Sequence, residues 1–336
     1  MPTSLSTPGP RIGIDLGGTK TEIAVLSRSG GYLLRRRVDT PRHDYEATVR
    51  TIAELVMAAE QTVDVTCTVG VGIPGAISPA SGLVKNANST WLNGKPLLQD
   101  LQASLGRPVR IQNDANCLAM SEAGSGLDGG AGDGAGCVLA LILGTGVGAG
   151  ICIDGRLLTG RNAIAGEWGH NPLPASGPGT SATPGQATAD DLPTLRCWCG
   201  REGCIETRLS GPALAADFAG AQRRGQAGGT GGSASAPADG IDARGVFLLA
   251  EQGDEQAAQA VDRWLDRLAR SLGVVINLLD PDVIVVGGGL SNAGVIYREL
   301  PRRWAAHIFS DRIETPVRPA RHGDSSGVRG AAWLWP

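Results

Sequence analysis

Two stretches of the chain share one pattern of apolar positions. Residues 11–26 (RIGIDLGGTKTEIAVL) carry apolar residues on both sides of a glycine pair, and residues 137–155 (CVLALILGTGVGAGICIDG) repeat that order. Apolar runs that flank a glycine turn predict two strands joined in a hairpin. The repeated strand–turn–strand unit indicates two similar lobes, each with its own glycine turn.

Other segments have the spacing of helices. Residues 44–60 place Val49, Ile52 and Val56 on one face, and residues 241–279 carry a longer apolar stripe of the same kind. Further strands are predicted within TVGVGIPG (68–75), VRIQN (109–113) and DPDVIVV (280–286).

Composition narrows the classes of protein that fit. Hydrophobic residues make up 42% of the 336 residues, which is typical of a globular chain. The 30 basic and 33 acidic residues give a net charge of −3, which argues against a general nucleic-acid or membrane-surface binder. The one basic run, 35–37, is interpreted as a solvated edge.

The N-terminal segment and the loops set further expectations. Residues 1–10 lack the basic and apolar regions of a secretory signal, and no apolar run is long enough to span a membrane. We therefore expect a soluble, cytoplasmic protein. Residues 175–190 and 219–240 are rich in small and polar residues, and we expect both to form mobile surface loops.

The first glycine turn, DLGGTK (15–20), has two interpretations. It lacks the Walker A pattern, but glycines in a turn let backbone N–H groups approach phosphate oxygens. Asp15 could then hold Mg²⁺ directly or through water, and Thr19 and Lys20 would add donors and charge. The alternative is an ordinary Gly-Gly hairpin, and this motif alone favours neither.

Two more glycine turns change that balance. They lie in LGTGVGAG (143–150) and GGGLS (287–291), and each follows an apolar strand. One such turn is weak evidence, whereas three turns that end buried strands predict a nucleotide cradle.

Asn113 and Asp114 stand at the end of a predicted strand, where functional residues of open α/β sheets gather. Asp114 could cap the following helix. It could equally be a general base, ionised at neutral pH, of the kind that phosphoryl transfer to a hydroxyl needs. Both interpretations stay open on the residues alone.

Three of the seven cysteines, Cys197, Cys199 and Cys204, fall within RCWCGREGCIE (196–206). Three thiolates on one short segment favour zinc, with a redox pair or three buried thiols as the alternatives. Zinc takes four ligands, and His170 in AGEWGHNPLP (165–174) is the candidate for the fourth. Such a closed site would be structural, and it would place Glu167 and Glu206 at one pocket that binds a polyol. The other four cysteines are interpreted as small buried hydrophobes.

Taken together, these motifs resemble the ROK family of sugar kinases and repressors. The resemblance runs from about residue 11 to 336, and its carriers are DLGGTK (15–20), GIPG (72–75), NDAN (113–116), LGTGVGAG (143–150), GEWGH (166–170), CWCGREGCIE (197–206) and GGG (287–289). Within the family, the segments 85–94, 166–174 and 322–336 most resemble bacterial fructokinases with mannokinase activity. N-acetylglucosamine kinases are the next most similar group.

The resemblance implies a fold, an activity and partners. The fold is a two-lobed α/β, actin-like ATPase (ribonuclease H-like) fold, and the activity is transfer of phosphate from ATP, with Mg²⁺, to the 6-hydroxyl of fructose, mannose or glucose. An N-acetylglucosamine or N-acetylmannosamine kinase, or a non-catalytic sugar-sensing regulator, is the alternative. The partners would be a hexose and ATP, with no nucleic acid and no membrane, and the protein would be a homodimer with a structural zinc.

The resemblance also implies residue roles. Asp114 would be the catalytic base. The sugar ligands would be Asn113, Glu167, His170 and Glu206, and the zinc ligands His170, Cys197, Cys199 and Cys204. The nucleotide-binding residues would be Asp15, Gly17, Gly18, Thr19, Lys20, Gly144, Thr145, Gly146, Gly148, Gly288 and Gly289. His170 would serve both sugar and metal, one ring nitrogen for each.

We expect the lobes to comprise residues 11–125 and 126–324, with a flexible tail at 1–10 and a C-terminal helix near 325–336 that returns to the first lobe. The tail is too short for the DNA-binding unit of the family's repressors. The loops 175–190 and 219–240 depart in composition from the family's usual sequence, and loops near the sugar pocket could alter substrate specificity. We further expect loss of a zinc ligand to weaken sugar binding and to leave ATP affinity near normal, because the glycine turns lie elsewhere in the sequence.

Overall fold

The computed structural model describes residues 9–124, 129–175, 195–226 and 240–335. The described chain divides into two compact units. The first comprises residues 1–140, 149–166 and 320–336, and the second comprises residues 141–148 and 167–319. Most of the two predicted loops, namely residues 176–190 and 227–239, lies outside the described residues, as do the first eight residues of the tail.

The first unit is built on a five-stranded sheet with the order β3-β2-β1-β4-β7. These strands are β1 (Arg11–Leu16), β2 (Lys20–Leu26), β3 (Tyr32–Asp39), β4 (Thr68–Ile73) and β7 (Val109–Asn113). β1 and β2 are the predicted hairpin, and Ile14 pairs with Ile23 in its antiparallel register. β4 lies parallel to both β1 and β7, so their carboxyl ends share one edge of the sheet.

One face of this sheet carries the core of the unit. Ile12 and Ile14 of β1 pack against buried side chains of α1 (Tyr45–Val63) such as Ile52, because alternate strand residues point to the same face. α2 (Leu97–Leu105) adds Leu97 and Leu101 to this cluster. The predicted helix at 44–60 is therefore confirmed with its apolar stripe buried.

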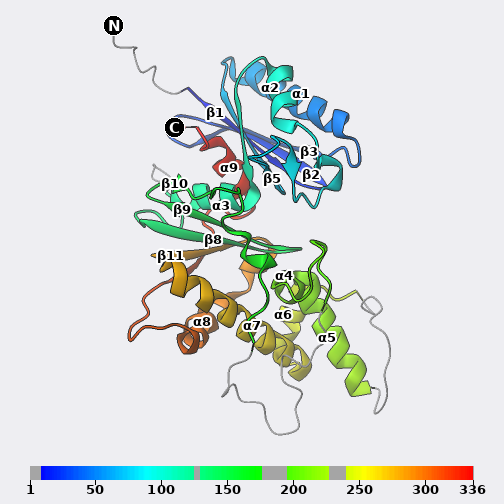
Figure 1. Ribbon diagram of the computed structural model, residues 1–336, viewed down its shortest axis with the longest axis vertical. Helices are drawn as coiled ribbons and strands as arrows, with labels where there is room; N and C mark the ends of the chain where they lie inside the picture. Colours follow the sequence, from blue (N-terminus) through cyan, green and yellow to red (C-terminus); the bar gives the residue numbers. More distant parts are fainter. Residues whose placement is uncertain (1–8, 125–128, 176–194, 227–239, 336) are drawn as a thin grey trace. The chain divides into compact units, whose positions relative to one another are not determined.

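The opposite face of the sheet receives the last helix of the chain, α9 (Ser326–Ala332), which is drawn in red beside β1 in Figure 1. Glycines make this close approach possible. A Cβ atom added at Gly13 would lie 2.7 Å from the Ala332 nitrogen, and one added at Gly70 would lie 2.8 Å from the Ala331 carbonyl carbon. Gly330 plays the same part toward α3 (Asp114–Ala123), so the backbone of α9 sits directly on its neighbours.

The basic run at 35–37 is not simply a solvated edge. In the β2–β3 register Glu22 lies opposite Arg37, and its side chain is only 4% exposed. The Nε atoms of Arg35 and Arg37 donate to the two Glu22 carboxylate oxygens at 2.5 and 2.8 Å. Two of the three arginines therefore neutralise a buried carboxylate, and the remaining one, Arg36, is exposed.

A second five-stranded sheet has the order β10-β9-β8-β11-β12. Its strands are β8 (Cys137–Leu143), β9 (Val147–Ile153), β10 (Arg156–Leu157), β11 (Val283–Gly287) and β12 (Val317–Pro319). β8 and β9 are the second strand–turn–strand unit, as the repeat predicts. The small pair β5 (Ala76–Ile77) and β6 (Val84–Lys85) forms a two-stranded sheet in the first unit.

The longest elements of the second unit are helices. They are α4 (Glu206–Leu209), α5 (Gly211–Gln226), α6 (Ala243–Glu251), α7 (Glu255–Leu279) and α8 (Gly294–Arg303). α7 packs against α5, α6 and α8, and its stripe residues Trp264, Leu268 and Leu272 are fully buried. Short 3₁₀ segments are η1 (Thr90–Leu92), η2 (Glu167–His170), η3 (Gly289–Asn292), η4 (Trp304–His307) and η5 (Gly323–Ser325).

The start of the predicted loop at 219–240 is wrong. Residues 219–226 belong to α5 instead of a loop, because alanine, glutamine and arginine are good helix formers and the helix begins earlier, on the apolar stretch at 211–219.

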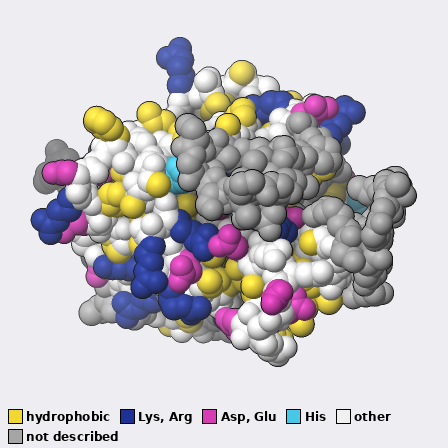
Figure 2. All heavy atoms as spheres, turned by 90° about the horizontal axis from the view of Figure 1, so that it is seen from below, with side chains coloured by type: hydrophobic (Ala, Val, Ile, Leu, Met, Phe, Trp, Pro, Cys, Tyr) yellow, Lys and Arg dark blue, Asp and Glu magenta, His cyan; other side chains and the backbone are white. Residues whose placement is uncertain are grey.

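Among the described helices, none is long and apolar enough to cross a bilayer. Basic and acidic side chains lie intermixed on the face drawn in Figure 2, in line with the near-balanced charge.

Candidate active site and metal centre

The first glycine turn joins β1 to β2 in the first unit. The Gly17 N–H donates to the Lys20 carbonyl at 2.9 Å, and the Thr40 hydroxyl donates to the Gly17 carbonyl at 2.9 Å. Gly18 and Thr19 are the exposed or half-exposed tip, and Lys20 forms an ion pair with Asp39. The turn is thus a fixed hairpin end, and the predicted nucleotide-binding residues 17–20 all lie on it.

Asp15, two residues before the turn, stands among other carboxylates. Burial raises the pKa of Asp15 to about 7, and the negative charges of Asp114 and Glu22 add to this effect, against a smaller opposite effect of Arg37. A buried carboxyl group with other carboxylates nearby is hard to ionise, and a cation beside it would favour its charged form. A carboxylate oxygen is a type of ligand that Mg²⁺ prefers, so the chemistry of Asp15 is compatible with the expected ion.

Asn113 and Asp114 occupy the junction between β7 and α3. Asn113 is the N-cap residue, and both its Oδ1 and that of Asp114 accept from the Ala115 N–H, at 2.9 and 2.8 Å. The Asn113 side-chain amide also donates to the Gly75 carbonyl at 3.3 Å. The N-cap is therefore Asn113, and Asp114 is the first helical residue, where the helix dipole favours its negative charge.

The second and third glycine turns lie together in the second unit. Gly288 has a positive φ of 81°, and a Cβ atom there would lie 2.6 Å from the Leu143 carbonyl oxygen. Gly144 and Gly289 are also neighbours, since a Cβ atom added at Gly144 would lie 3.7 Å from the Gly289 nitrogen. The structure thus brings the turns at 144–146 and 287–289 side by side, with Thr145 exposed and Gly148 in the strand that follows.

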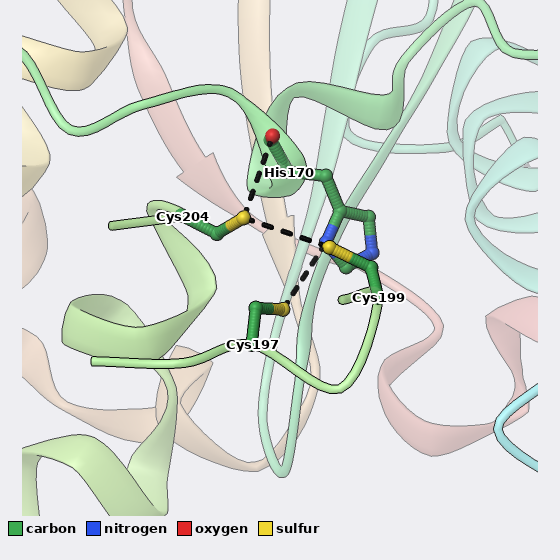
Figure 3. Close-up of side chains that lie close together, drawn as sticks. All are labelled: His170, Cys197, Cys199 and Cys204. Carbon is green, nitrogen blue, oxygen red and sulfur yellow. Dashed lines mark hydrogen bonds between the residues drawn. The ribbon is translucent and has the colours of Figure 1, made fainter. Parts of the chain in front are cut away.

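The four predicted zinc ligands converge in the second unit, and Figure 3 shows their side chains pointing toward one another. The candidate ligand atoms of His170, Cys197, Cys199 and Cys204 all lie within 4.8 Å of one another. Cys197 Sγ is 3.6 Å from His170 Nδ1, and Cys199 Sγ is 3.7 Å from Cys204 Sγ. Tetrahedral zinc with ordinary bond lengths sets ligand atoms about 3.6–3.8 Å apart, so the donor set fits this ion.

The acidity of the thiols points the same way. Burial acts against ionisation of Cys199, but the backbone and side chain of Arg201 and the neighbouring thiols outweigh it and lower its pKa to about 6. Burial, with the neighbouring thiols, raises the pKa of Cys204 to about 12, and burial also raises the pKa of Cys197. One thiolate therefore forms near neutral pH, and three would need a cation between them.

Backbone pairing holds the two ligand segments together. Pro172 and Cys204 form an isolated β-bridge, and the Ile205 N–H donates to the Asn171 carbonyl at 2.9 Å. The Leu173 N–H donates to the Gly203 carbonyl at 2.9 Å. The segments at 165–174 and 196–206 thus form one site, as their composition suggests, and only Nδ1 of His170 faces the thiols in this arrangement.

The two predicted sugar-binding glutamates differ in their surroundings. Glu167 begins η2 and is half-buried. Glu206 begins α4, and its carboxylate already accepts hydrogen bonds from Trp198 Nε1 at 2.6 Å and from the Val147 N–H at 2.9 Å. Sequence reasoning did not single out Trp198, although an aromatic residue between two ligand cysteines is a signal that could have found it.

Comparison with known proteins places these features in one family. Residues 11–336 match the ROK family. The N-acetyl-D-glucosamine kinase of Citrobacter koseri is 39% identical over 328 residues, which cover 96% of this chain and 98% of that protein. An N-acetyl-D-glucosamine kinase of Escherichia coli is 38% identical over the same length.

Solved structures agree on the fold. The ROK hexokinase of Thermus thermophilus superposes with a TM-score of 0.76 at 30% identity and covers 96% of both chains. The ROK family glucokinase of Streptomyces griseus, solved with glucose and AMPPNP, gives a TM-score of 0.74 at 29% identity and covers 97% of this chain and 99% of that one. The predicted actin-like α/β fold is therefore confirmed.

Proposed function

The chain belongs to the ROK family, and we propose that within this family of sugar kinases it is an ATP-dependent N-acetylglucosamine kinase that phosphorylates the 6-hydroxyl group. The observation that carries this choice is the identity of 39% over nearly the whole length of an N-acetyl-D-glucosamine kinase. These relatives do not support the predicted fructokinase. They favour the N-acetylglucosamine alternative instead.

In this proposal Asp114 is the general base. Its carboxylate is anchored at the first turn of α3 by the Ala115 N–H, which fixes the oxygen that takes the hydroxyl proton. Asn113 binds the sugar beside it while its amide is held by the Gly75 carbonyl. Such positioning of the nucleophile supplies much of the catalysis in phosphoryl transfer.

The glycine turns bind the phosphates in this proposal. Backbone N–H groups of the turns at 17–20, 144–146 and 288–289, other than those of Gly17 and Gly144 that donate within the turns, would donate to phosphate oxygens without a Cβ atom in the way. Asp15 would hold Mg²⁺, which supplies neutralisation of the developing phosphate charge. Asp15 is buried beside Asp114 and Glu22, which raises its pKa, and a cation bound there would favour its charged form.

We further propose that His170, Cys197, Cys199 and Cys204 hold a structural zinc. Three thiolates and one imidazole close the coordination sphere, so the ion would fix the shape of the sugar-binding wall and take no part in the reaction. Glu167 and the free ring nitrogen of His170 would then bind sugar hydroxyl groups. The homodimer stays a prediction that sedimentation would test.

A coupled assay of ADP formation tests the substrate. We expect N-acetylglucosamine to give a higher kcat/KM than N-acetylmannosamine, glucose, mannose or fructose. A higher kcat/KM for fructose would reinstate the fructokinase prediction. Turnover of none of these sugars by a protein that binds them would favour a sugar-sensing regulator.

The role of Asp114 is tested by Asp114→Asn. We expect kcat to fall by about 10²–10⁴, the scale of a lost general base, with sugar affinity retained. Asp44→Asn is a matched control, because Asp44 is also an aspartate at a helix N-terminus of the first unit and accepts from the Ala47 N–H. Equal kcat for both variants would leave Asp114 with only a structural role in the first turn of α3.

A further inference from the structure

The carboxylate of Glu206 joins two parts of the second unit that the sequence presents as separate. One oxygen accepts the indole N–H of Trp198, which lies between two zinc-ligand cysteines, at 2.6 Å. The other accepts the backbone N–H of Val147, the first residue after the second glycine turn, at 2.9 Å. Glu206 thus connects the cysteine segment with the predicted phosphate-binding turn.

Two glycines near Glu206, at positions 146 and 211, allow and strengthen its contact with the turn. A Cβ atom at Gly146 would lie 2.7 Å from Glu206 Oε2, so glycine at this position lets the carboxylate reach the turn. Five residues after Glu206, the Gly211 N–H donates to the Gly144 carbonyl at 2.7 Å. The segment 206–211 therefore holds the turn from both ends.

Trp198 extends the connection to the sugar side. Trp198 is 55% exposed, which is unusual for a large aromatic residue. Its indole ring nevertheless contacts both Glu206 and His170. The indole lies edge-on to the His170 ring, with centroids 5.2 Å apart and an angle of 82° between the planes.

We propose that Trp198 and Glu206 are positioning residues that couple the sugar and zinc wall to the nucleotide-binding turn at 144–146. The inference rests on the proposed function, in which His170 contacts sugar and the turn contacts phosphate. Occupation of the sugar site orders Trp198 and Glu206, which hold the Val147 N–H and the turn in one arrangement. Because such coupling is reciprocal, nucleotide binding strengthens sugar binding by the same factor.

Two substitutions test the coupling, each read at the opposite site. Trp198→Phe keeps an aromatic ring beside His170 and removes the N–H that Glu206 accepts. We expect calorimetry to show the Kd for AMPPNP rising by about 5- to 50-fold, with one zinc per chain retained. In Gly146→Ala the added methyl group displaces the Glu206 carboxylate from the turn at 144–146. We expect the Kd for N-acetylglucosamine to rise by about 5- to 50-fold in this variant.

Trp335→Phe is the matched control. It also removes an indole hydrogen bond, at 2.7 Å to the Val69 carbonyl, but in the first unit. We expect both Kd values to stay within about twofold of the wild type in this variant, since loss of a remote hydrogen bond affects stability alone.

The outcomes separate the coupling from the proposed function. An AMPPNP Kd within twofold of the wild type in zinc-loaded Trp198→Phe would overturn the coupling, even where the wild type phosphorylates N-acetylglucosamine normally. If Trp198→Phe loses zinc, the Gly146→Ala variant provides the test instead. A Kd for N-acetylglucosamine that is unchanged in Gly146→Ala would then overturn the coupling. If the wild type does not turn over N-acetylglucosamine, the proposed substrate fails, and the AMPPNP titration still decides the coupling.

Discussion

Substitution of Gly70 by alanine should be among the most disruptive single-methyl changes in the first unit. The added Cβ atom would lie 2.8 Å from the Ala331 carbonyl carbon and nearer still to its oxygen. Both are backbone atoms of α9, so no side chain can rotate away. Either β4 or α9 must move by roughly an ångström in a region where protein interiors are close-packed.

The expected cost follows from that displacement. Overpacking of a core costs about 1–3 kcal/mol and more where backbone must shift. For a unit of this size each kcal/mol lowers Tm by about 2–4 °C, so a cost at the upper end of that range, about 3 kcal/mol, predicts that Gly70→Ala lowers Tm by about 6–12 °C. Thermal unfolding followed by circular dichroism measures this shift.

Gly31→Ala is the control for this experiment. Gly31 has a φ outside the left-handed region, and its added Cβ atom would lie 3.5 Å from Ser27 Oγ, an ordinary contact distance. We expect a change in Tm of less than about 2 °C there, as for most surface substitutions. A Gly70→Ala protein as stable as the Gly31→Ala protein would show that α9 does not pack on β4 through this glycine.

Two further predictions concern the second unit. Asp217 accepts a hydrogen bond from Arg267, whose side chain is 2% exposed. Asp217→Asn should therefore lower the free energy of unfolding in urea at pH 7 by about 3–5 kcal/mol. Asp262→Asn, which removes one partner of an exposed ion pair with Arg303, should lower it by less than about 1 kcal/mol. Burial alone would raise the pKa of Asp217, but the hydrogen bonds and charges of Arg263 and Arg267 outweigh it and lower the pKa. The stabilisation by Asp217 is therefore present above the unfolded pKa of about 4 and is lost as the pH falls through the folded pKa. A difference in unfolding free energy between the wild type and Asp217→Asn that stays constant on acidification would contradict this assignment. Cys199→Ala should abolish zinc in elemental analysis while Cys137→Ala keeps it, and equal zinc in the two variants would exclude the proposed ligand set.

The parts of the fold that depend on local sequence were predictable. Each strand–turn–strand unit is a contiguous stretch with its own glycine turn, and the stripe of α7 is visible in 241–279. The cysteine site was predictable for the same reason, since three of its four ligands lie within one short segment. Hydrophobic period and ligand chemistry are enough where the partners are close in sequence.

Features that depend on distant partners were not predictable. Gly13 and Gly70 read as ordinary strand glycines until α9, more than 250 residues after Gly13, is seen to pack on them. The pairing of Arg37 with Glu22 depends on the register of β2 and β3, which the basic run itself does not encode. Substrate choice among hexoses rests on contacts of this distant kind, so the resemblance of three segments to fructokinases favoured fructose where the full-length relatives favour N-acetylglucosamine.

The contacts of Glu206 also change the expectation for loss of zinc. The sequence places the cysteine segment and the second glycine turn about 50 residues apart, which suggested that ATP affinity would survive loss of a zinc ligand. In the structure the segment that begins at Cys204 supplies a thiol to the metal site, the Glu206 carboxylate to Val147 and the Gly211 N–H to Gly144. Loss of the metal would remove one attachment of this segment, and the hydrogen bonds to Val147 and Gly144 that follow it in sequence would be held less firmly, because neighbouring contacts open together as a local unit. Removal of zinc by a chelator should therefore raise the Kd for AMPPNP together with that for sugar, and a rise in the sugar Kd alone would show that the turn at 144–146 is held independently of the metal site.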